Sequence, residues 1–261
     1  MGILNTVVRL ERLDSAILLV EINRPDARNA VNGDVAAGID MAVRESEDDP
    51  EIRVVVLTGA GDRAFCAGAD LKALAAGEQQ RLRTPLGGFA GFVNYPRSKP
   101  WIAAVNGAAL AGGCELALAC DLIVACDTAT FGLPEVRRGL IAAGGGVYRL
   151  VRALPRAIAM EAILTGAPIS AATAHAAGLI SQVVPSSKLK DEAVRIAHQI
   201  ANNAPLAVKE SLGIARQAFD RSDAELAAIS QAASSRVIHS EDFDEGARAF
   251  IEKRTPNWKG R

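Results

Sequence analysis

Two carboxylates, Glu115 and Glu135, stand beside glycine-bearing apolar stretches at positions typical of helix starts. Glu115 follows Gly112 and Gly113 within WIAAVNGAALAGGCELALACD, residues 101–121, and its neighbours there are small or aliphatic. Burying an acid costs free energy unless the acid has a partner or a task. The pattern therefore predicts carboxylates that do acid–base chemistry in a site with little water.

Two glycine-bearing loops, each after an apolar run, predict backbone N–H groups that bind a negative charge. One loop is residues 67–70, AGAD, and the other is residues 111–114, AGGC. Small residues let a ligand approach the backbone closely, and a glycine turn before a helix directs N–H groups at an anion. Two converging N–H groups would form an oxyanion hole, in which one donor typically contributes about 3–4 kcal/mol to transition-state stabilisation.

No serine, cysteine or histidine stands where a charge-relay nucleophile would be recognisable. The cysteines form no C-x-x-C pair, so they are interpreted as reduced and buried, and no metal site is predicted. The histidines fall in the helical part and are interpreted as surface or helix-packing residues. These residues are Cys66, Cys114, Cys120, Cys126, His175, His198 and His239.

The composition describes a globular protein that can bury a sizeable core. The chain has 261 residues, of which 49% are hydrophobic and 23% charged, and this fits one large domain or a core with a smaller appendage. A net charge of -1 and 4% aromatic residues argue against nucleic acid or an anionic membrane as partner. The first residues lack the pattern of a signal peptide, and no apolar run spans a bilayer, so we expect a cytoplasmic protein.

The order of elements predicts an α/β protein. Strands and helices alternate in the first part, whereas the last part is helical, which indicates a βα-type core at residues 1–200 and a helical C-terminal region at 201–261. The apolar residues within 77–100 follow no clear helical or strand period. This segment is interpreted as either a mobile lid or a surface connection. The expected strands are 6–9, 16–22, 53–58, 101–105, 122–126 and 179–184, and the expected longer helices are 33–46, 147–151, 186–203, 205–219, 223–237 and 241–253.

A dinucleotide fingerprint is rejected. Gly59, Gly61 and Ala64 follow a strand with the required spacing, but Phe65 and the residues after it extend an irregular stretch where the fingerprint needs a helix.

The chain resembles the enoyl-CoA hydratase/isomerase family, also called the crotonase family. The similarity covers essentially the whole chain and includes INRPDARNAVN, GDRAFCAGADL, IAAVNGAALAGGCELALACD, FGLPEVRRGLIAAGGG and FIEKRTPNWKGR. It implies a crotonase-like spiral of repeated ββα units and a C-terminal helical region that forms a homotrimer or a dimer of trimers. It also implies a 2-enoyl-CoA hydratase without a separate cofactor, because coenzyme A is carried by the substrate.

The resemblance assigns catalytic roles by position. The N–H groups of Ala69 and Gly112 match the donors to the thioester oxygen. Glu115 and Glu135, 20 residues apart, match the two glutamates that hold one water. Glu115 would activate the water, and Glu135 would exchange the proton at C2 of the acyl chain.

The resemblance also implies where coenzyme A binds. Backbone near the adenine is expected at residues 67–69, and basic side chains near the phosphates, with an ordinary solvated charge as the alternative for each. The tail is expected to complete the site, in some members from a neighbouring subunit. The expected residues are Ala67, Gly68, Asp70, Leu71, Arg28, Arg63, Trp258 and Lys259, with Asp70 also holding its loop.

Two departures from the family pattern concern the acyl end. Residues 142–147 read AAGGGV where many hydratases have a PGAGGT-type loop, and Ala108 stands where aromatic residues are frequent. Acyl-chain preference is therefore open. The alternatives are another acyl-CoA lyase or isomerase that uses the same enolate, and a non-catalytic acyl-CoA-binding protein. The presence of both glutamates favours hydration.

Overall fold

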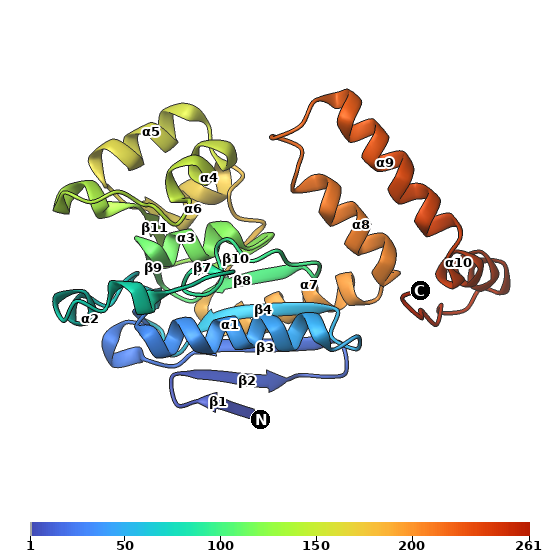
Figure 1. The fold of residues 1–261 in the computed structure, drawn as a ribbon, viewed down its shortest axis with the longest axis horizontal. Helices are drawn as coiled ribbons and strands as arrows, with labels where there is room; N and C mark the ends of the chain where they lie inside the picture. Colours follow the sequence, from blue (N-terminus) through green and yellow to red (C-terminus); the bar gives the residue numbers. More distant parts are fainter. Residues whose placement is uncertain (1) are drawn as a thin grey trace.

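A computed structural model describes residues 2–261 (Figure 1). Its largest sheet has seven strands in the order β1-β2-β3-β4-β8-β10-β13. The strands from β3 to β13 pair in parallel, whereas β1 and β2 are antiparallel additions at one edge. The bounds are β1 Gly2–Asn5, β2 Val8–Arg12, β3 Ile17–Ile22, β4 Val54–Gly59, β8 Trp101–Val105, β10 Leu122–Cys126 and β13 Gln182–Val184.

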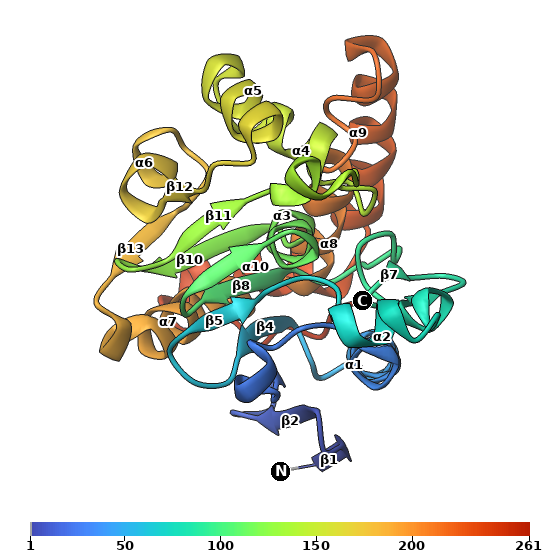
Figure 2. The ribbon, with the colours of Figure 1, turned by 90° about the vertical axis from the view of Figure 1, so that its left-hand side faces the viewer.

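A second sheet of four short strands has the order β12-β11-β9-β5. Strands β5, β9 and β11 are parallel, and β12 pairs antiparallel with β11. Figure 2 shows this sheet beside β8 and β10 of the larger one. The bounds are β5 Ala64–Cys66, β9 Ala108–Leu110, β11 Thr130–Gly132 and β12 Ile169–Ser170; β6 Arg83–Thr84 and β7 Gly88–Phe89 form a separate pair.

Helices cover both faces of the large sheet. Helix α1 contacts β1 to β3, and α7 contacts β3, β4, β8 and β10. In Figure 1, α1 lies in front of the strands and α7 behind them. The bounds in this part are α1 Gly33–Asp48, α2 Leu71–Ala75, α3 Gly112–Ala119, α4 Gly146–Ala153, α5 Arg156–Thr165, α6 Ala171–Ala176 and α7 Leu189–Ala201, with 3₁₀ helices η1 Pro25–Ala27, η2 Gln79–Leu82, η3 Pro134–Arg138 and η4 Ser186–Lys188.

The local sequence explains the central elements. All five residues of β8 are buried, as an uninterrupted apolar run in a parallel strand covered on both faces requires. The Asn32 side chain accepts a hydrogen bond from the Val35 N–H and caps α1 where its pattern begins. The α/β class is confirmed, and its core lies between the large sheet and its helices.

Three helices follow at the end of the chain: α8 Pro205–Ala215, α9 Asp223–Ile238 and α10 Glu241–Glu252. They stand to one side of the sheets in Figure 1, with the C-terminus beside α10. Their starts match the expected ones because Pro205 begins α8 and Ser222 forms a capping box on α9. That these helices form a region separate from residues 1–200 stays a prediction.

Some expected boundaries were wrong. The first hairpin strand is Val8–Arg12 rather than 6–9, because residues 6 and 7 form the turn after β1, which the sequence analysis did not predict. The last strand begins at Gln182 rather than at 179, because residues 177 and 178 turn after α6 and leave only three residues to pair with β10.

Residues 77–100 are not a plain surface connection. Leu82, Phe89, Phe92 and Val93 are at most 8% exposed, and the β6–β7 hairpin is built within the segment. The Phe92 ring also packs on Trp101 of β8 at 4.8 Å between centroids. Apolar residues without a regular period thus form a packed wall. That the segment moves as a lid stays a prediction.

Candidate active site

Strand register in the small sheet explains why two distant loops meet. Cys66 of β5 lies opposite Ala109 of β9 in the parallel pair. Beyond the ends of these strands, Ala69 follows Cys66 by three residues and Gly112 follows Ala109 by three residues (66 + 3 = 69 and 109 + 3 = 112). Because parallel strands end at the same sheet edge, the two glycine-bearing loops emerge side by side.

The loops are in close contact at Gly68. A side-chain carbon at Gly68, whose φ is +90°, would lie 2.9 Å from the Gly112 nitrogen. The neighbouring backbone holds Val31, whose N–H donates to Gly68 O and whose carbonyl accepts from the Asp70 N–H, each at 2.8 Å. Within residues 2–261, no backbone acceptor is bound by the N–H of Ala69 or of Gly112. These two donors therefore suit an external oxyanion.

The turn into α3 is strained. Ala111 has φ 52° and ψ -129°, a conformation that non-glycine residues rarely adopt. Its N–H donates to Gly132 O of β11 at 2.9 Å, and this bond helps to hold the turn. The strain turns the chain so that Gly112 begins α3 with a free helix-start N–H. Ala111 was expected in the 111–114 loop, but its strained backbone was not predicted, because an alanine carries no local signal for positive φ.

Register also places the two acids together. Gly132 of β11 lies opposite Leu110 of β9, so η3 and α3 leave adjacent strands in the same direction. Glu135 is in the first turn of η3, and Glu115 is in the first turn of α3. Their separation of 20 residues reflects one strand–helix repeat between the two strands.

Glu115 is buried in a cradle of glycines. Its Oε1 accepts a hydrogen bond from the Gly146 N–H at 2.9 Å, and the residue is 4% exposed. A side-chain carbon at Gly144 would lie 2.6 Å from Oε2, so the loop wraps the carboxylate closely. Burial raises the pKa of Glu115, while the N–H groups of Gly146 and Gly144 and the charges of Arg149 and Arg83 oppose that rise.

Glu135 has fewer donors. Its Oε2 is buried and has no hydrogen-bond partner in the described chain. Burial raises the pKa of Glu135, and the Glu115 charge raises it further, against its own backbone N–H and Arg138. Burial therefore acts on both carboxyls, but the charged form of Glu115 is supported by two backbone N–H groups and two arginines, whereas that of Glu135 is supported only by its own backbone N–H and Arg138.

The predicted coenzyme A loop is assembled by local contacts. The Ala67 N–H donates to Arg28 O at 3.0 Å, and Arg28 is exposed with φ 52°. Leu71 is 63% exposed at the start of α2, so an apolar side chain is available to a ligand. Arg63 is also exposed, on the loop before β5. Their contact with coenzyme A stays a prediction.

Asp70 is occupied within the chain. It accepts from the Lys72 N–H as the cap of α2 and from Arg24 Nη2 at 2.8 Å. Burial acts to raise the pKa of Asp70, but these donors hold that pKa below its ordinary value. Asp70 therefore holds the 67–70 loop, as expected from the sequence.

Asn29 is a residue of this loop system that the sequence analysis missed. It is fully buried with φ 55°, its Oδ1 accepts from the Arg24 N–H, and its Nδ2 donates to Ala60 O and Ala64 O. One side chain thereby fastens the 24–29 turn to the chain entering β5. The available signal was an asparagine in a short polar turn, since asparagine tolerates positive φ.

Lys259 is not brought to this site within one chain. Its N–H donates to Asp242 Oδ1 at 2.6 Å, and Trp258 Nε1 donates to Asn202 O at 2.7 Å. The tail thus docks beside α10, at the opposite side of Figure 1 from α2. The role of Lys259 in coenzyme A binding stays a prediction.

The four cysteines are free, and the surroundings of three of them make those three poor nucleophiles. Burial raises the pKa of Cys66, Cys114 and Cys120 to about 12. Among residues 2–261, no three His, Cys, Asp or Glu side chains gather as metal ligands. None of the helices in the described chain combines the length and apolar content needed to cross a membrane.

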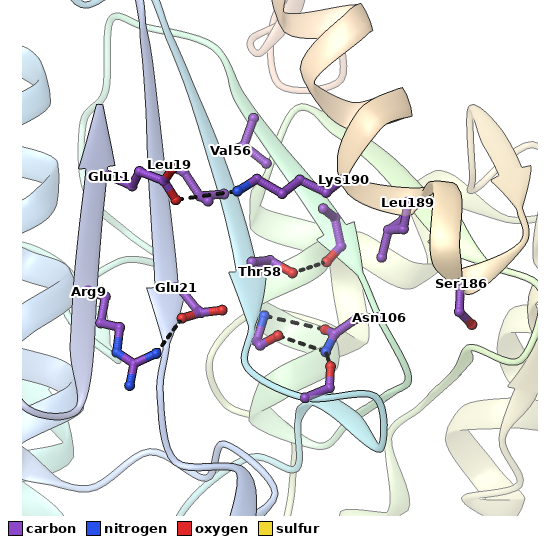
Figure 3. Close-up of a pocket in the computed structure, with 13 residues that line it drawn as sticks. Arg9, Glu11, Leu19, Glu21, Val56, Thr58, Asn106, Ser186, Leu189 and Lys190 are labelled. Atoms are coloured by element: carbon purple, nitrogen blue, oxygen red, sulfur yellow. Dashed lines mark hydrogen bonds and ion pairs between the residues drawn. The ribbon is translucent and has the colours of Figure 1, made fainter. Parts of the chain in front are cut away.

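A pocket of about 220 Å³ with charged and apolar lining residues lies elsewhere, between the large sheet and α7 (Figure 3). Its charged groups already pair with each other, Lys190 with Glu11 at 3.3 Å and Arg9 with Glu21 at 3.4 Å. Asn106 donates to Gly59 O and holds the end of β4. None of the predicted site residues lines this pocket, and its groups have no evident task beyond structure.

Comparison with known proteins supports the sequence resemblance. The sequence profile of the family described as enoyl-CoA hydratase/isomerase matches residues 12–261. A carnitinyl-CoA dehydratase of Proteus mirabilis (strain HI4320) is 43% identical over 251 residues, covering 94% of this chain and 96% of that protein.

Solved structures show the same relationship. An enoyl-CoA hydratase from Mycobacterium tuberculosis H37Rv matches with a TM-score of 0.94 and 44% identity, over 98% of this chain and 100% of that chain. A carnitinyl-CoA hydratase from Mycobacterium avium matches with a TM-score of 0.78 and 47% identity, over the same shares.

Proposed function

Because this chain belongs to the enoyl-CoA hydratase/isomerase family, an enzyme family that acts on acyl-CoA thioesters, we propose that it adds water reversibly across the C2–C3 double bond of 2-enoyl-CoA. The observation that carries the proposal is the pair of unlike carboxylates, Glu115 and Glu135, on adjacent elements beside the free N–H of Gly112. A hydratase needs both a base and an acid, and we propose that these two carboxyls supply one of each.

The oxyanion donors make the addition possible. When water oxygen bonds to C3, the electrons of the C2–C3 double bond move toward C1 and place negative charge on the thioester oxygen. The N–H groups of Ala69 and Gly112 are proposed to hold that oxygen. Gly112 is the first residue of α3, so the positive end of the helix dipole stabilises the same charge.

The acids divide the proton transfers. Glu115, ionised, takes a proton from the water as its oxygen attacks C3. Glu135, protonated, delivers a proton to C2 as the enolate collapses. Each hydration therefore leaves a proton on Glu115 and removes one from Glu135, and exchange with solvent restores the pair. Dehydration runs through the same states in reverse.

The groups around the acids favour an uncharged acyl chain. Exposed side chains beside Glu135 on η3 include Arg137 and Arg138. A cationic acyl group that came near these arginines would meet like charges.

Carnitinyl-CoA is the second candidate substrate. The specific support is the 43% identity to a protein named carnitinyl-CoA dehydratase and the 47% identity to one named carnitinyl-CoA hydratase. The chemistry at C2 and C3 would be unchanged. The candidates differ in the trimethylammonium group carried by the acyl chain.

A substrate comparison tests the proposal. Purified protein is mixed with crotonyl-CoA, and hydration is measured as loss of the conjugated thioester absorbance. In a separate assay with carnitinyl-CoA, dehydration is measured as a gain of the same absorbance. We expect turnover of both with a higher kcat/KM for crotonyl-CoA. A preference for carnitinyl-CoA would select the second candidate. Double-bond migration or cleavage would indicate another lyase or isomerase, and binding without turnover a non-catalytic protein.

We further propose a homotrimer or a dimer of trimers in the cytoplasm. The α10 side chains Phe243, Phe250 and Ile251 are between 49% and 86% exposed, a larger apolar surface than a lone helix usually presents to water. Assembly would also bring the Lys259 tail of one copy toward the 67–70 loop of another. Light scattering of the purified protein measures the number of copies.

A further inference from the structure

Arg149 of α4 contacts two separate walls of the proposed active site. Its Nη1 donates to Gly144 O at 2.8 Å, and its Nη2 donates to Val93 O at 2.6 Å. The first carbonyl belongs to the glycine loop around Glu115, and the second belongs to the 77–100 segment. The planar guanidinium spans both because its donors diverge from one rigid group.

The glycine loop is shaped to accept this guanidinium. Gly145 has φ +103°, and a side-chain carbon there would lie 2.1 Å from Arg149 Nη1. The same three-residue loop supplies the Gly146 N–H to Glu115 Oε1. The position of Arg149 is thus coupled to the donor that holds the carboxylate.

The 77–100 side of the contact reaches the oxyanion donor. The Val93 N–H donates to Phe89 O at 3.3 Å, and the Phe89 ring packs so closely on Gly112 that a side-chain carbon there would lie 2.4 Å from it. One guanidinium therefore joins the loop that holds the base to the wall beside the oxyanion donor.

We propose that Arg149 is a positioning residue that fixes the 144–146 loop against the 77–100 segment. It thereby holds the Glu115 carboxylate where it can take a proton from the water that attacks C3. This inference rests on the proposed function of Glu115. It extends that function by assigning a task to a residue that contacts neither the reacting atoms nor the thioester.

Charge contributes beside geometry. Two cations act on Glu115, Arg149 from α4 and Arg83 from β6. Glu135 from η3 interacts with Glu115 as a like charge. The neighbouring Cys114 thiol stays neutral, because burial raises its pKa to about 12. Both arginines lower the pKa of Glu115 against burial. Loss of Arg149 should therefore raise the pKa of Glu115. If activity needs ionised Glu115, the pH below which kcat falls should then move upward.

Two substitutions separate geometry from charge. Arg149→Met keeps length but removes both donors and the charge. We expect kcat to fall about 10- to 100-fold with little change in KM, because small misplacements of catalytic groups have effects of that size. The acid limb of the kcat–pH profile should move to higher pH. Arg149→Lys keeps the charge, so the acid limb should return to its pH in the unaltered chain. We expect kcat to stay low, because an ammonium lacks the two diverging N–H donors of the guanidinium that span both carbonyls.

Arg152→Met is the matched control. Arg152 lies on the same helix, three residues later, and pairs with Asp220 at 2.7 Å. Its loss should leave kcat and the pH limb unchanged. The proposal is overturned if Arg149→Met matches Arg152→Met, or if kcat falls with the pH limb unmoved, which would indicate a merely structural role.

A titration separates failure of this inference from failure of the proposed function. Glutamate carboxyls are labelled with carbon-13, and the Glu115 signal is identified by its loss in Glu115→Gln. Glu115 should titrate at higher pH in Arg149→Met than in the unaltered chain. This result holds or fails even if no 2-enoyl-CoA is turned over, whereas absent turnover with a shifted titration would overturn only the proposed function.

Discussion

Glu115 lies in the first turn of an α-helix and is enclosed by a glycine loop that donates an N–H to it. Glu135 lies in the first turn of a 3₁₀ helix on the neighbouring strand, and its buried Oε2 has no donor. Burial raises the pKa of both. The difference lies in what opposes burial, and it shows how one sheet edge can give two identical side chains unlike surroundings.

The largest expected effect removes either carboxylate. Glu115→Gln and Glu135→Gln should each lower kcat for crotonyl-CoA hydration about 10²- to 10⁴-fold, because each loses one proton transfer. The residual activities should differ in pH profile. Without Glu115 the acid limb should disappear, and without Glu135 the basic limb should disappear. Initial rates between pH 5 and 10 measure this, and limbs lost in the opposite order would reverse the assigned roles.

An intermediate effect changes only the enclosure of Glu115. Gly144→Ala would place a side-chain carbon 2.6 Å from Oε2 and displace the carboxylate. We expect kcat to fall about 10- to 100-fold with the fold retained. Gly213→Ala in α8 is the control, because no atom lies within 4 Å of the added carbon. Steady-state kinetics of the two variants decide, and equal rates would show that the loop does not position the base.

The smallest expected effect is on stability. A carboxyl whose folded pKa is raised contributes stability below its ordinary value near 4.5, and that contribution is lost as pH rises through the folded pKa. Glu135→Gln should therefore raise Tm by about 2 °C at pH 8 and leave it unchanged at pH 4. Glu115→Gln should gain less, because its donors favour the charged form. Calorimetry at both pH values checks the comparison, and an equal gain for the two variants would contradict it.

Much of the site could be predicted from local pattern. The glycines before Glu115, the apolar strands and the separation of the two glutamates all follow from residue types at short range. The catalytic roles assigned to Ala69, Gly112, Glu115 and Glu135 came from resemblance to a family, and they remain to be tested by the substitutions above. Local pattern failed where a feature depends on a distant contact, as at Ala111, whose positive φ depends on the strand β11 that holds it.

The sequence by itself determined the longer helices and the central strands of the large sheet, because caps, glycine turns and hydrophobic period act within a few residues; the short strands of the second sheet were not predicted. Only the tertiary structure decided which of these elements meet. Strand pairing brings Gly68 against Gly112, 44 residues later (112 − 68 = 44), and packing sets Arg149 against Val93. Docking of the tail on α10 likewise keeps Lys259 away from its expected site within one chain. Such contacts join segments far apart in sequence, and no local preference specifies them.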